Sequence, residues 1–252
     1  MSKTVTKIGD CTLYQGDCLE IMPTLGKVDA VVTDPPYKVT SGGFGNLEGG
    51  FSGWIKDAYD NKGSIVSCDL DWIDWLPAVF KICADQAHCY VFTNDRNLPQ
   101  AWDAAEKSGF VFHRLLTWNK KTALPNRWYI QNCEFVLFMR RGKAFPIQKC
   151  GSMALQTVFQ KDESAHPTEK PVELIRLYIE NSTQLGGTVF DPFMGSGTTG
   201  VACAKLGRKV VGIELEPKYF DIACKRIEDA YKQPDLFVEP PHSIEQKDLV
   251  FE

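Results

Sequence analysis

Short runs of β-branched and aromatic residues alternate along this chain with longer segments in which apolar residues recur at helical spacing. Such alternation is typical of an α/β domain in which helices cover both faces of a doubly wound sheet. Gly109, Gly186 and Gly207 mark the expected C-terminal ends of three helices. Strands are expected at 11–15, 28–33, 87–93, 110–118, 133–139, 187–190 and 209–213, and helices at 18–24, 70–85, 97–108, 171–185, 197–206 and 216–231.

The chain has 252 residues, which is enough for one large domain, and we expect that domain to span residues 1–232. Residues 38–69 form a long glycine-rich connection directly after the Asp-Pro-Pro-Tyr turn at 34–37, and we interpret them as a flexible flap over a substrate. The alternative is a surface loop without a function. A second long connection covers residues 121–165, and the proline-containing acidic tail at 233–252 is expected to be weakly ordered.

The most informative segment is an apolar strand at 28–33 that delivers Asp34, Pro35, Pro36 and Tyr37 to its carboxyl end. Ligands of open α/β sheets bind at the carboxyl ends of the strands. A carboxylate beside an aromatic ring offers a hydrogen-bond acceptor and a stacking face. This combination suits a flat ring that carries an amine.

A second segment, residues 188–200, reads as a short strand, a tight glycine turn and a helix start. Gly195 and Gly197 allow the backbone to approach a ligand closely, and Glu214 ends the next strand, where an acid can accept hydrogen bonds from both ribose hydroxyls. The turn lacks the lysine of a phosphate-binding loop, and Asp191 would repel a pyrophosphate. The pattern therefore favours a nucleoside without phosphates.

The formal net charge is −4, but the charge is unevenly distributed. Between residues 114 and 149, eight basic side chains stand against the single acid Glu134, and aromatic residues lie among them. Such an island is what phosphate and base contacts require, although a solvated hairpin with basic turns would look the same. The residues that we expect to bind DNA are Lys120, Lys121, Arg127, Arg140, Arg141 and Lys143.

Nine cysteines are scattered without a Cys-x-x-Cys pair, so we expect reduced, mostly buried thiols and no metal site. No apolar run approaches the roughly 18–20 residues that span a bilayer, and the N-terminus lacks the core of a signal peptide. We therefore expect a soluble, cytoplasmic protein with no membrane partner.

Three segments, Asp34 to Tyr37, His166 to Pro171 and Asp191 to Thr199, together resemble the amino-directed DNA methyltransferases that use S-adenosylmethionine. Their order is similar to that of the circularly permuted β group. The resemblance implies a Rossmann-like methyltransferase sheet, mostly parallel with an antiparallel hairpin strand, and a target-recognition insertion at about 121–165. Taken alone, the segment from His166 to Pro171 also reads as a helix start punctuated by prolines.

The resemblance implies a role for each matching position. Asp34 and the Pro35 carbonyl, held by the rigid backbone of Pro35 and Pro36, would accept the two hydrogens of the target amine, while Tyr37 would stack on the base. For Asp17, a helix N-cap is nearly as good an interpretation. Cofactor contacts are implied for Asp17, His166, Thr168, Lys170, Asp191, Phe193, Gly195, Gly197 and Glu214.

Within this family, an aspartate at the position of Asp34 mostly accompanies adenine N6, whereas a serine mostly accompanies cytosine N4. We therefore expect methylation of adenine N6 in duplex DNA, with the base flipped out of the helix, either within restriction-modification or by a solitary or phage-type enzyme. Methylation of cytosine N4 is the alternative. An RNA adenine methyltransferase and a catalytically silent nucleic-acid-binding homologue are further alternatives, and a dinucleotide-dependent oxidoreductase leaves the Asp-Pro-Pro-Tyr turn unexplained.

Trp72, Trp75 and Phe80 give the expected helix at 70–85 a strongly apolar surface. This surface could form a homodimer, or it could pack on the sheet, and sequence spacing does not distinguish the two. We expect burial within the chain.

Overall fold

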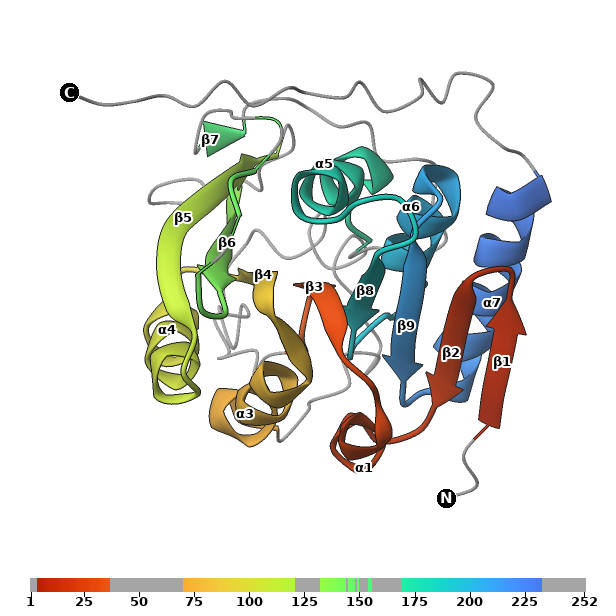
Figure 1. Ribbon diagram of the computed structural model, residues 1–252, viewed down its shortest axis with the longest axis horizontal. Helices are drawn as coiled ribbons and strands as arrows, with labels where there is room; N and C mark the ends of the chain where they lie inside the picture. Colours follow the sequence, from red (N-terminus) through yellow and green to blue (C-terminus); the bar gives the residue numbers. More distant parts are fainter. Residues whose placement is uncertain are drawn as a thin grey trace, which may run out of the picture.

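The computed structural model describes residues 4–36, 70–120, 132–143, 145–147, 149, 154–155 and 169–232 (Figure 1). Within these residues, nine strands form one mixed sheet in the order β1-β2-β9-β8-β3-β4-β6-β5-β7. The strands are β1 Thr4–Ile8, β2 Cys11–Gln15, β3 Val28–Thr33, β4 Cys83–Thr93, β5 Val111–Asn119, β6 Cys133–Arg140, β7 Ala154–Leu155, β8 Thr188–Asp191 and β9 Lys209–Glu214. The helices are α1 Cys18–Ile21, the short 3₁₀ helix η1 Met22–Thr24, α3 Trp72–Ile82, α4 Leu98–Lys107, α5 Val172–Ser182, α6 Thr198–Leu206 and α7 Pro217–Lys232.

The central strands β2, β9, β8, β3 and β4 run parallel, whereas β6 pairs antiparallel with both β4 and β5. The expected sheet, mostly parallel with an antiparallel hairpin, is confirmed. From β3 the chain moves through α3 to β4, and from β8 it moves through α6 to β9 on the other side. The boundary between β3 and β8 is therefore a topological switch point, the place where sheets of this kind bind ligands.

Two apolar cores lie on opposite faces of the sheet, because alternate strand residues point to opposite sides. In β6, Val136 and Phe138 belong to one core, whereas Leu137 and Met139 belong to the other. Helices α5, α6 and α7 cover the first face, and α1, α3 and α4 cover the second (Figure 1). Both faces are thus buried, which explains the nearly continuous apolar runs of the central strands.

Seven predicted strands and six predicted helices are present, with shifted ends in several cases. The hairpin strand β1 was not predicted, because it is an exposed edge strand whose sequence Thr-Val-Thr-Lys-Ile carries little apolar signal. The two-residue β7 was also missed. Strand β4 begins four residues before the predicted start at 87, because the backbone at Cys83 turns extended immediately after α3 and pairs with Val28.

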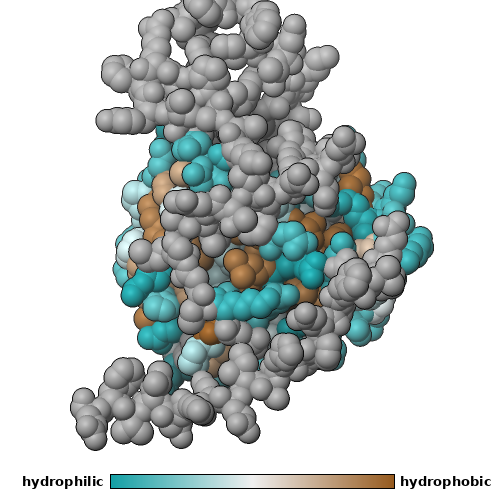
Figure 2. Space-filling view, turned by 90° about the horizontal axis from the view of Figure 1, so that it is seen from above, coloured by the Kyte–Doolittle hydropathy of each residue, from teal (hydrophilic) through white to brown (hydrophobic). Residues whose placement is uncertain are grey.

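The structure buries Trp75, whose side chain is 2% exposed and packs edge-on against Phe193 with ring centroids 5.0 Å apart. Trp72 and Phe80 are half-buried, and Phe80 contacts Phe110 across the same core. Burial within the chain therefore accounts for most of the apolar surface of α3. The face seen in Figure 2 shows hydrophobic residues of the described part in small areas between hydrophilic ones.

None of the seven cysteines within the described residues forms a disulfide, and five of them are buried, as expected of reduced thiols. Of the helices that the structure describes, none is long and apolar enough to cross a bilayer. The expected flap at 38–69 and the tail at 233–252 lie outside the described residues, as does most of the insertion at 121–165.

Candidate active site

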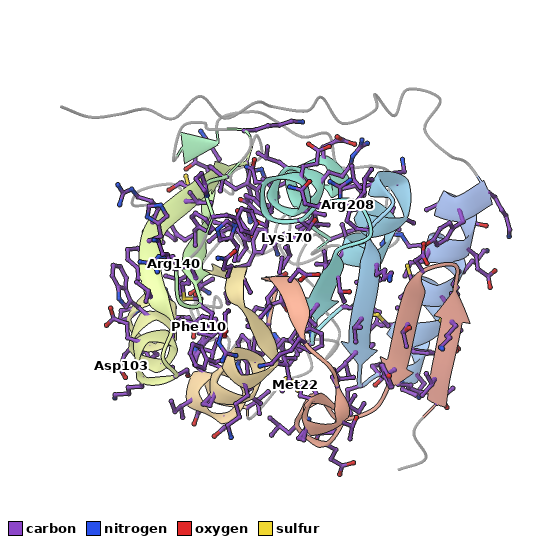
Figure 3. The ribbon with its side chains drawn as sticks, viewed as in Figure 1. Met22, Asp103, Phe110, Arg140, Lys170 and Arg208 are labelled. Carbon is purple, nitrogen blue, oxygen red and sulfur yellow. The ribbon has the colours of Figure 1, made fainter. Side chains whose placement is uncertain are left out.

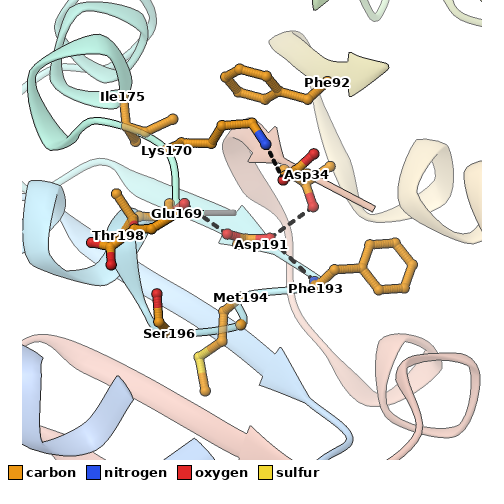
Figure 4. A pocket seen from close by; sticks show the side chains of 13 residues that line it. Asp34, Phe92, Glu169, Lys170, Ile175, Asp191, Phe193, Met194, Ser196 and Thr198 are labelled. Atoms are coloured by element: carbon orange, nitrogen blue, oxygen red, sulfur yellow. Dashed lines mark hydrogen bonds and ion pairs between the residues drawn. The ribbon is translucent and has the colours of Figure 1, made fainter. Parts of the chain in front are cut away.

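The candidate site lies where β3 and β8 end side by side. These strands pair in parallel through Val31 and Phe190, so the side chains that follow them meet at one edge of the sheet. The Thr33 hydroxyl donates a hydrogen bond of 2.7 Å to Oδ1 of Asp191 across this boundary. A cavity of about 130 Å³ opens here between the strand ends, the segment before α5 and the start of α6 (Figure 4).

Asp34 lies at the end of β3 on the wall of this cavity. Its Oδ2 accepts a hydrogen bond from the Lys170 ammonium, whereas its buried Oδ1 has no hydrogen-bond partner among the described residues. Burial raises the pKa of the Asp34 carboxyl, and the positive charge of Lys170 counteracts that rise. Pro35 is buried beside it and Pro36 is exposed, while Tyr37 lies outside the described residues.

Lys170 is 8% exposed, which is unusual for a lysine and requires compensating negative charge. Besides Asp34, its Nζ contacts Oε2 of Glu134 at 3.2 Å and lies 5.1 Å from the centroid of the Phe92 ring. The other Glu134 oxygen is paired with Lys120. Two carboxylates and two ammonium groups thus alternate from Asp34 through Lys170 and Glu134 to Lys120.

Asp191 is 4% exposed and is held from three directions. Besides the Thr33 hydroxyl, its carboxylate accepts from the Thr199 hydroxyl at 2.7 Å and from the backbone N–H of Phe193 at 3.2 Å. Burial raises its pKa from 3.8 to about 6, despite these donors. The carboxylate therefore fixes the end of β8 against β3 and the start of α6.

The glycine turn between β8 and α6 takes the left-handed backbone that its sequence predicts, with φ of 50° at Gly195 and 83° at Gly197. A methyl group at Gly197 would lie 2.8 Å from Cβ of Ala223 on α7, whereas one at Gly195 would meet no atom of the described structure within 4 Å. Gly197 therefore permits close helix packing, and Gly195 borders open space. Met194 and Ser196 of the same turn line the cavity.

Glu214 at the end of β9 accepts a 2.9 Å hydrogen bond from the N–H of Gly195, and burial raises the pKa of its carboxyl. Asp17 follows β2, and the N–H of the preceding Gly16 bonds the carbonyl of Glu214 at 2.9 Å. The Asp17 carboxylate accepts from the N–H of Leu19 at 2.8 Å and so caps α1. The N-cap interpretation of Asp17 describes the observed contact, and its cofactor role stays a prediction.

Arg226 of α7 joins two segments of the site. Its guanidinium donates to the backbone carbonyl of Ser196 at 2.7 Å and to the Ser196 hydroxyl at 2.8 Å, and it pairs with Glu169. Glu169 precedes Lys170, and its side chain is 5% exposed. The arginine therefore ties the glycine turn to the segment that carries Lys170.

The predicted DNA-binding residues that the structure describes are divided between the two opposite ends of the strands. Lys120 lies at the site, but Arg140 is the last residue of β6, at the end of that strand away from the site, and Figure 3 shows Arg140 apart from Lys170. Arg141 binds the carbonyls of Phe80 and Cys83 at the end of α3, where it has a structural task. Lys143 follows at that edge, and Lys121 and Arg127, like the predicted cofactor residues His166 and Thr168, lie outside the described residues.

The sequence did not single out Glu134, Glu169 or Arg226 as functional. Glu134 carried a signal, because it shares a strand face with Val136 and Phe138, where a charged residue is out of place without a partner. Arg226 carried none, since a basic residue on an amphipathic helix is common. What brings these residues together is the pairing of β4 with β6 and the packing of α6 on α7.

A comparison with protein families matches residues 28–225 to the DNA methylases of the N6/N4 type. A Type II methyltransferase of Streptococcus pneumoniae, M2.DpnII, is 29% identical over 80% of this chain and 82% of its own length. M2.MboI of Moraxella bovis is 28% identical over 85% of this chain and 86% of its own. Both relatives thus match along most of their length.

Solved structures agree with this match. The complex of M1.HpyAVI with SAM superimposes with a TM-score of 0.67 at 27% identity, covering 86% of this chain and 99% of the other. The cytosine-N4-specific PvuII DNA methyltransferase also gives 0.67, at 16% identity over 88% of this chain and 91% of its own. At that identity the second likeness shows the shared fold alone.

Proposed function

The chain belongs to the family of N6/N4 DNA methylases, and we propose that it transfers the methyl group of S-adenosylmethionine to the N6 amine of adenine in duplex DNA. The observation that carries the proposal is the state of Asp34. One of its oxygens is held by Lys170, and the other is buried and unpartnered among the described residues, next to a cavity that reaches the glycine turn. This free oxygen is a site for an N–H donor.

The residues at the cavity fit the proposed cofactor. Gly195 borders open space, the Glu214 carboxylate lies at the neighbouring strand end, and Phe193 offers an apolar face. Asp191, Phe193, Gly195, Gly197 and Glu214 would hold it, and it would supply a methyl group bound to a positively charged sulfur. A buried carboxylate such as Asp191 in place of a phosphate-binding lysine suits a ligand without phosphates.

Asp34 and the Pro35 carbonyl would act on the target amine. The lone pair of an exocyclic amine is delocalised into the base, so the amine is a weak nucleophile. Two acceptors, one for each N–H, favour a pyramidal nitrogen whose lone pair points away from the ring. The nitrogen gains positive charge as the N–C bond forms and the S–C bond breaks, and the Asp34 carboxylate stabilises that charge until a proton leaves.

Lys170 has a defined task in this scheme, because the acceptor must be ionised. Burial alone would favour the neutral carboxyl of Asp34, and the adjacent ammonium favours the carboxylate. Asp34 thus combines a desolvated site, in which hydrogen bonds are strong, with the charge that the reaction needs.

The target base of a duplex must leave the stack before its amine can reach Asp34, which costs a few kcal/mol. Stacking on Tyr37 would offset this cost by about 1–3 kcal/mol, and contacts with phosphates would supply the rest. Of the basic residues predicted to bind DNA, Lys120 lies beside the site, and we assign the phosphate contacts of the duplex to this end of the strands. Arg140, Arg141 and Lys143 lie at the other end of the strands and are not included.

Adenine is favoured over cytosine because the family pattern associates an aspartate at the position of Asp34 with adenine. The test is transfer from labelled S-adenosylmethionine to unmethylated duplex DNA, with single-stranded DNA and RNA in parallel, followed by mass analysis of the nucleosides. N6-methyldeoxyadenosine from duplex DNA is the expected product. N4-methyldeoxycytidine, or transfer to RNA alone, would contradict the proposal.

A further inference from the structure

Glu134 occupies an unexpected position for a residue outside the catalytic turn and the glycine turn. It lies at the start of β6, opposite Trp118 of β5, and its side chain is only 16% exposed. Strand β6 runs antiparallel to β4, so its first residues lie at the edge where β3 and β8 end. The topology therefore brings a carboxylate to the proposed site from an element that no motif of the site includes.

The contacts of Glu134 are with the cations of the site. Its Oε1 pairs with Lys120, and its Oε2 lies 3.2 Å from Nζ of Lys170. The same Nζ is bonded to Oδ2 of Asp34. Lys170 is thus shared between a carboxylate that would touch the target amine and one that lies behind the ammonium.

Because Lys170 is shared in this way, one oxygen of Asp34 stays available to accept a hydrogen bond from the target amine. A lysine that gave its whole charge to Asp34 would compete with the amine for the same carboxylate, since both are N–H donors. Glu134 forms an ion pair with that ammonium, with 3.2 Å between its Oε2 and Nζ of Lys170, and attracts it away from the amine side. The buried Oδ1 of Asp34 is the result, an acceptor without a donor among the described residues.

We propose that Glu134 is a positioning residue for methyl transfer, which holds the Lys170 ammonium so that one Asp34 oxygen stays free for the target amine. The inference rests on the proposed function, because it assigns Asp34 the role of amine acceptor. Lys120, on the other oxygen of Glu134, fixes the orientation of that carboxylate.

The charges around Asp34 give the proposal a specific signature. Lys170 and Lys120 favour the ionised form of Asp34, whereas Glu134 opposes it. Asp191 on β8 and Glu169, which is paired with Arg226, are further acids that line the cavity. Removing the Glu134 charge therefore lowers the pKa of Asp34, and removing the Lys120 charge raises it. General damage to the fold would not produce opposite shifts from two residues in direct contact.

The experiment measures kcat and the pH dependence of kcat/KM for duplex DNA in the wild type, Glu134→Gln and Lys120→Met. For Glu134→Gln we expect kcat to fall about 10-fold or more, because the acceptor is misplaced and more tightly paired. The acid limb of kcat/KM should move to lower pH in Glu134→Gln and to higher pH in Lys120→Met. Glu106→Gln, the same change at an exposed position of α4, is the matched control and should behave as the wild type.

Equilibrium binding of S-adenosylmethionine is measured on the same proteins and should change less than about twofold in Glu134→Gln. Unchanged kcat in that variant, or acid limbs that move in the same direction in both variants, would overturn the inference. If Glu134→Gln does not fold, the direction of the shift in Lys120→Met decides alone. A wild type that binds S-adenosylmethionine but methylates no DNA would instead overturn the proposed function.

Discussion

Lys170 forms an ion pair with Asp34 at the end of β3, although the two residues are 136 positions apart in the chain. Lys170 is 8% exposed, and the pair joins the turn after β3 to the segment before α5 at the wall of the cavity. The turn after β3 and the proposed cofactor side of the site are therefore connected through charge.

Lys170→Met should make methyl transfer more sensitive to acid. Removing the positive charge raises the pKa of Asp34, because burial then acts with less opposition. The acid limb of the kcat/KM profile for duplex DNA should move to higher pH, so that activity is lost first under mildly acidic conditions. Lys107→Met, which removes an exposed lysine of α4, is the control, and a Lys170→Met profile that coincides with it would contradict the role given to Lys170.

Arg226→Ala should loosen the proposed cofactor side of the site. The substitution removes the bonds to Ser196 and leaves the buried Glu169 carboxylate without this partner. Loss of one partner from a buried pair typically costs about 3–5 kcal/mol, and the partial exposure of Arg226 places the expected loss at about 2–3 kcal/mol. Urea unfolding and S-adenosylmethionine binding should both weaken, while Lys225→Ala on the exposed side of α7 leaves them unchanged.

Gly195 and Gly197, in the turn between β8 and α6, should differ in their response to substitution by alanine. Both have positive φ, which costs about 1 kcal/mol for a residue with Cβ. Only at Gly197 would the methyl group also collide with Ala223, which adds about 1–3 kcal/mol of overpacking. Urea unfolding should therefore rank Gly197→Ala below Gly195→Ala in stability, with Gly26→Ala, an unstrained and open position, as control. Equal losses at 195 and 197 would show that the contact with α7 is not tight.

His88 should make the fold sensitive to acid independently of the site. It is 2% exposed on β4, with Nδ1 3.0 Å from the Ser182 hydroxyl and Nε2 3.1 Å from the Phe145 carbonyl. Burial lowers its pKa from 6.5 to about 4, so the folded state favours the neutral ring. Its contribution to stability is present above about pH 6.5 and is lost as the pH falls through about 4.

The measurement for His88 is urea unfolding of the wild type and His88→Gln between pH 4 and 8. Relative to the variant, the wild type should lose about 2–3 kcal/mol of unfolding free energy as the pH falls across this range. A difference between the two proteins that stays constant with pH would contradict the assignment of the pKa shift to His88.

Local sequence signals predicted the elements that carry the site, because each has its own pattern. The apolar strand before Asp34, the glycine turn after Asp191 and the helix starts all appear where expected. The motifs also resembled the amino-directed DNA methyltransferases, and this resemblance placed the Asp34 turn and the glycine turn after Asp191 in a single site. These features depend on neighbours in sequence, so spacing alone reveals them.

Other features of the site depend on the order of strands and on contacts between distant helices. The meeting of Glu134 with Lys170 requires β6 to insert between β4 and β5, an order that the chain sequence does not specify. The basic island suggested one DNA-binding surface. Strand β6, however, runs from Glu134 at the site to Arg140 at the other end of the strands, and Arg141 donates a hydrogen bond to the Cys83 carbonyl at the end of α3. The number of basic residues in this stretch of sequence therefore did not predict where their charges lie in the fold.

The account depends above all on Asp34 as the group that acts on the target amine. Asp34→Asn keeps the size of the side chain and removes its charge, and the decisive measurement compares single-turnover transfer to duplex DNA with equilibrium binding of S-adenosylmethionine in this variant. The account predicts transfer reduced by about 100-fold or more, with cofactor affinity within about twofold of the wild type. Transfer at the wild-type rate, or a loss explained by weaker cofactor binding, would contradict it.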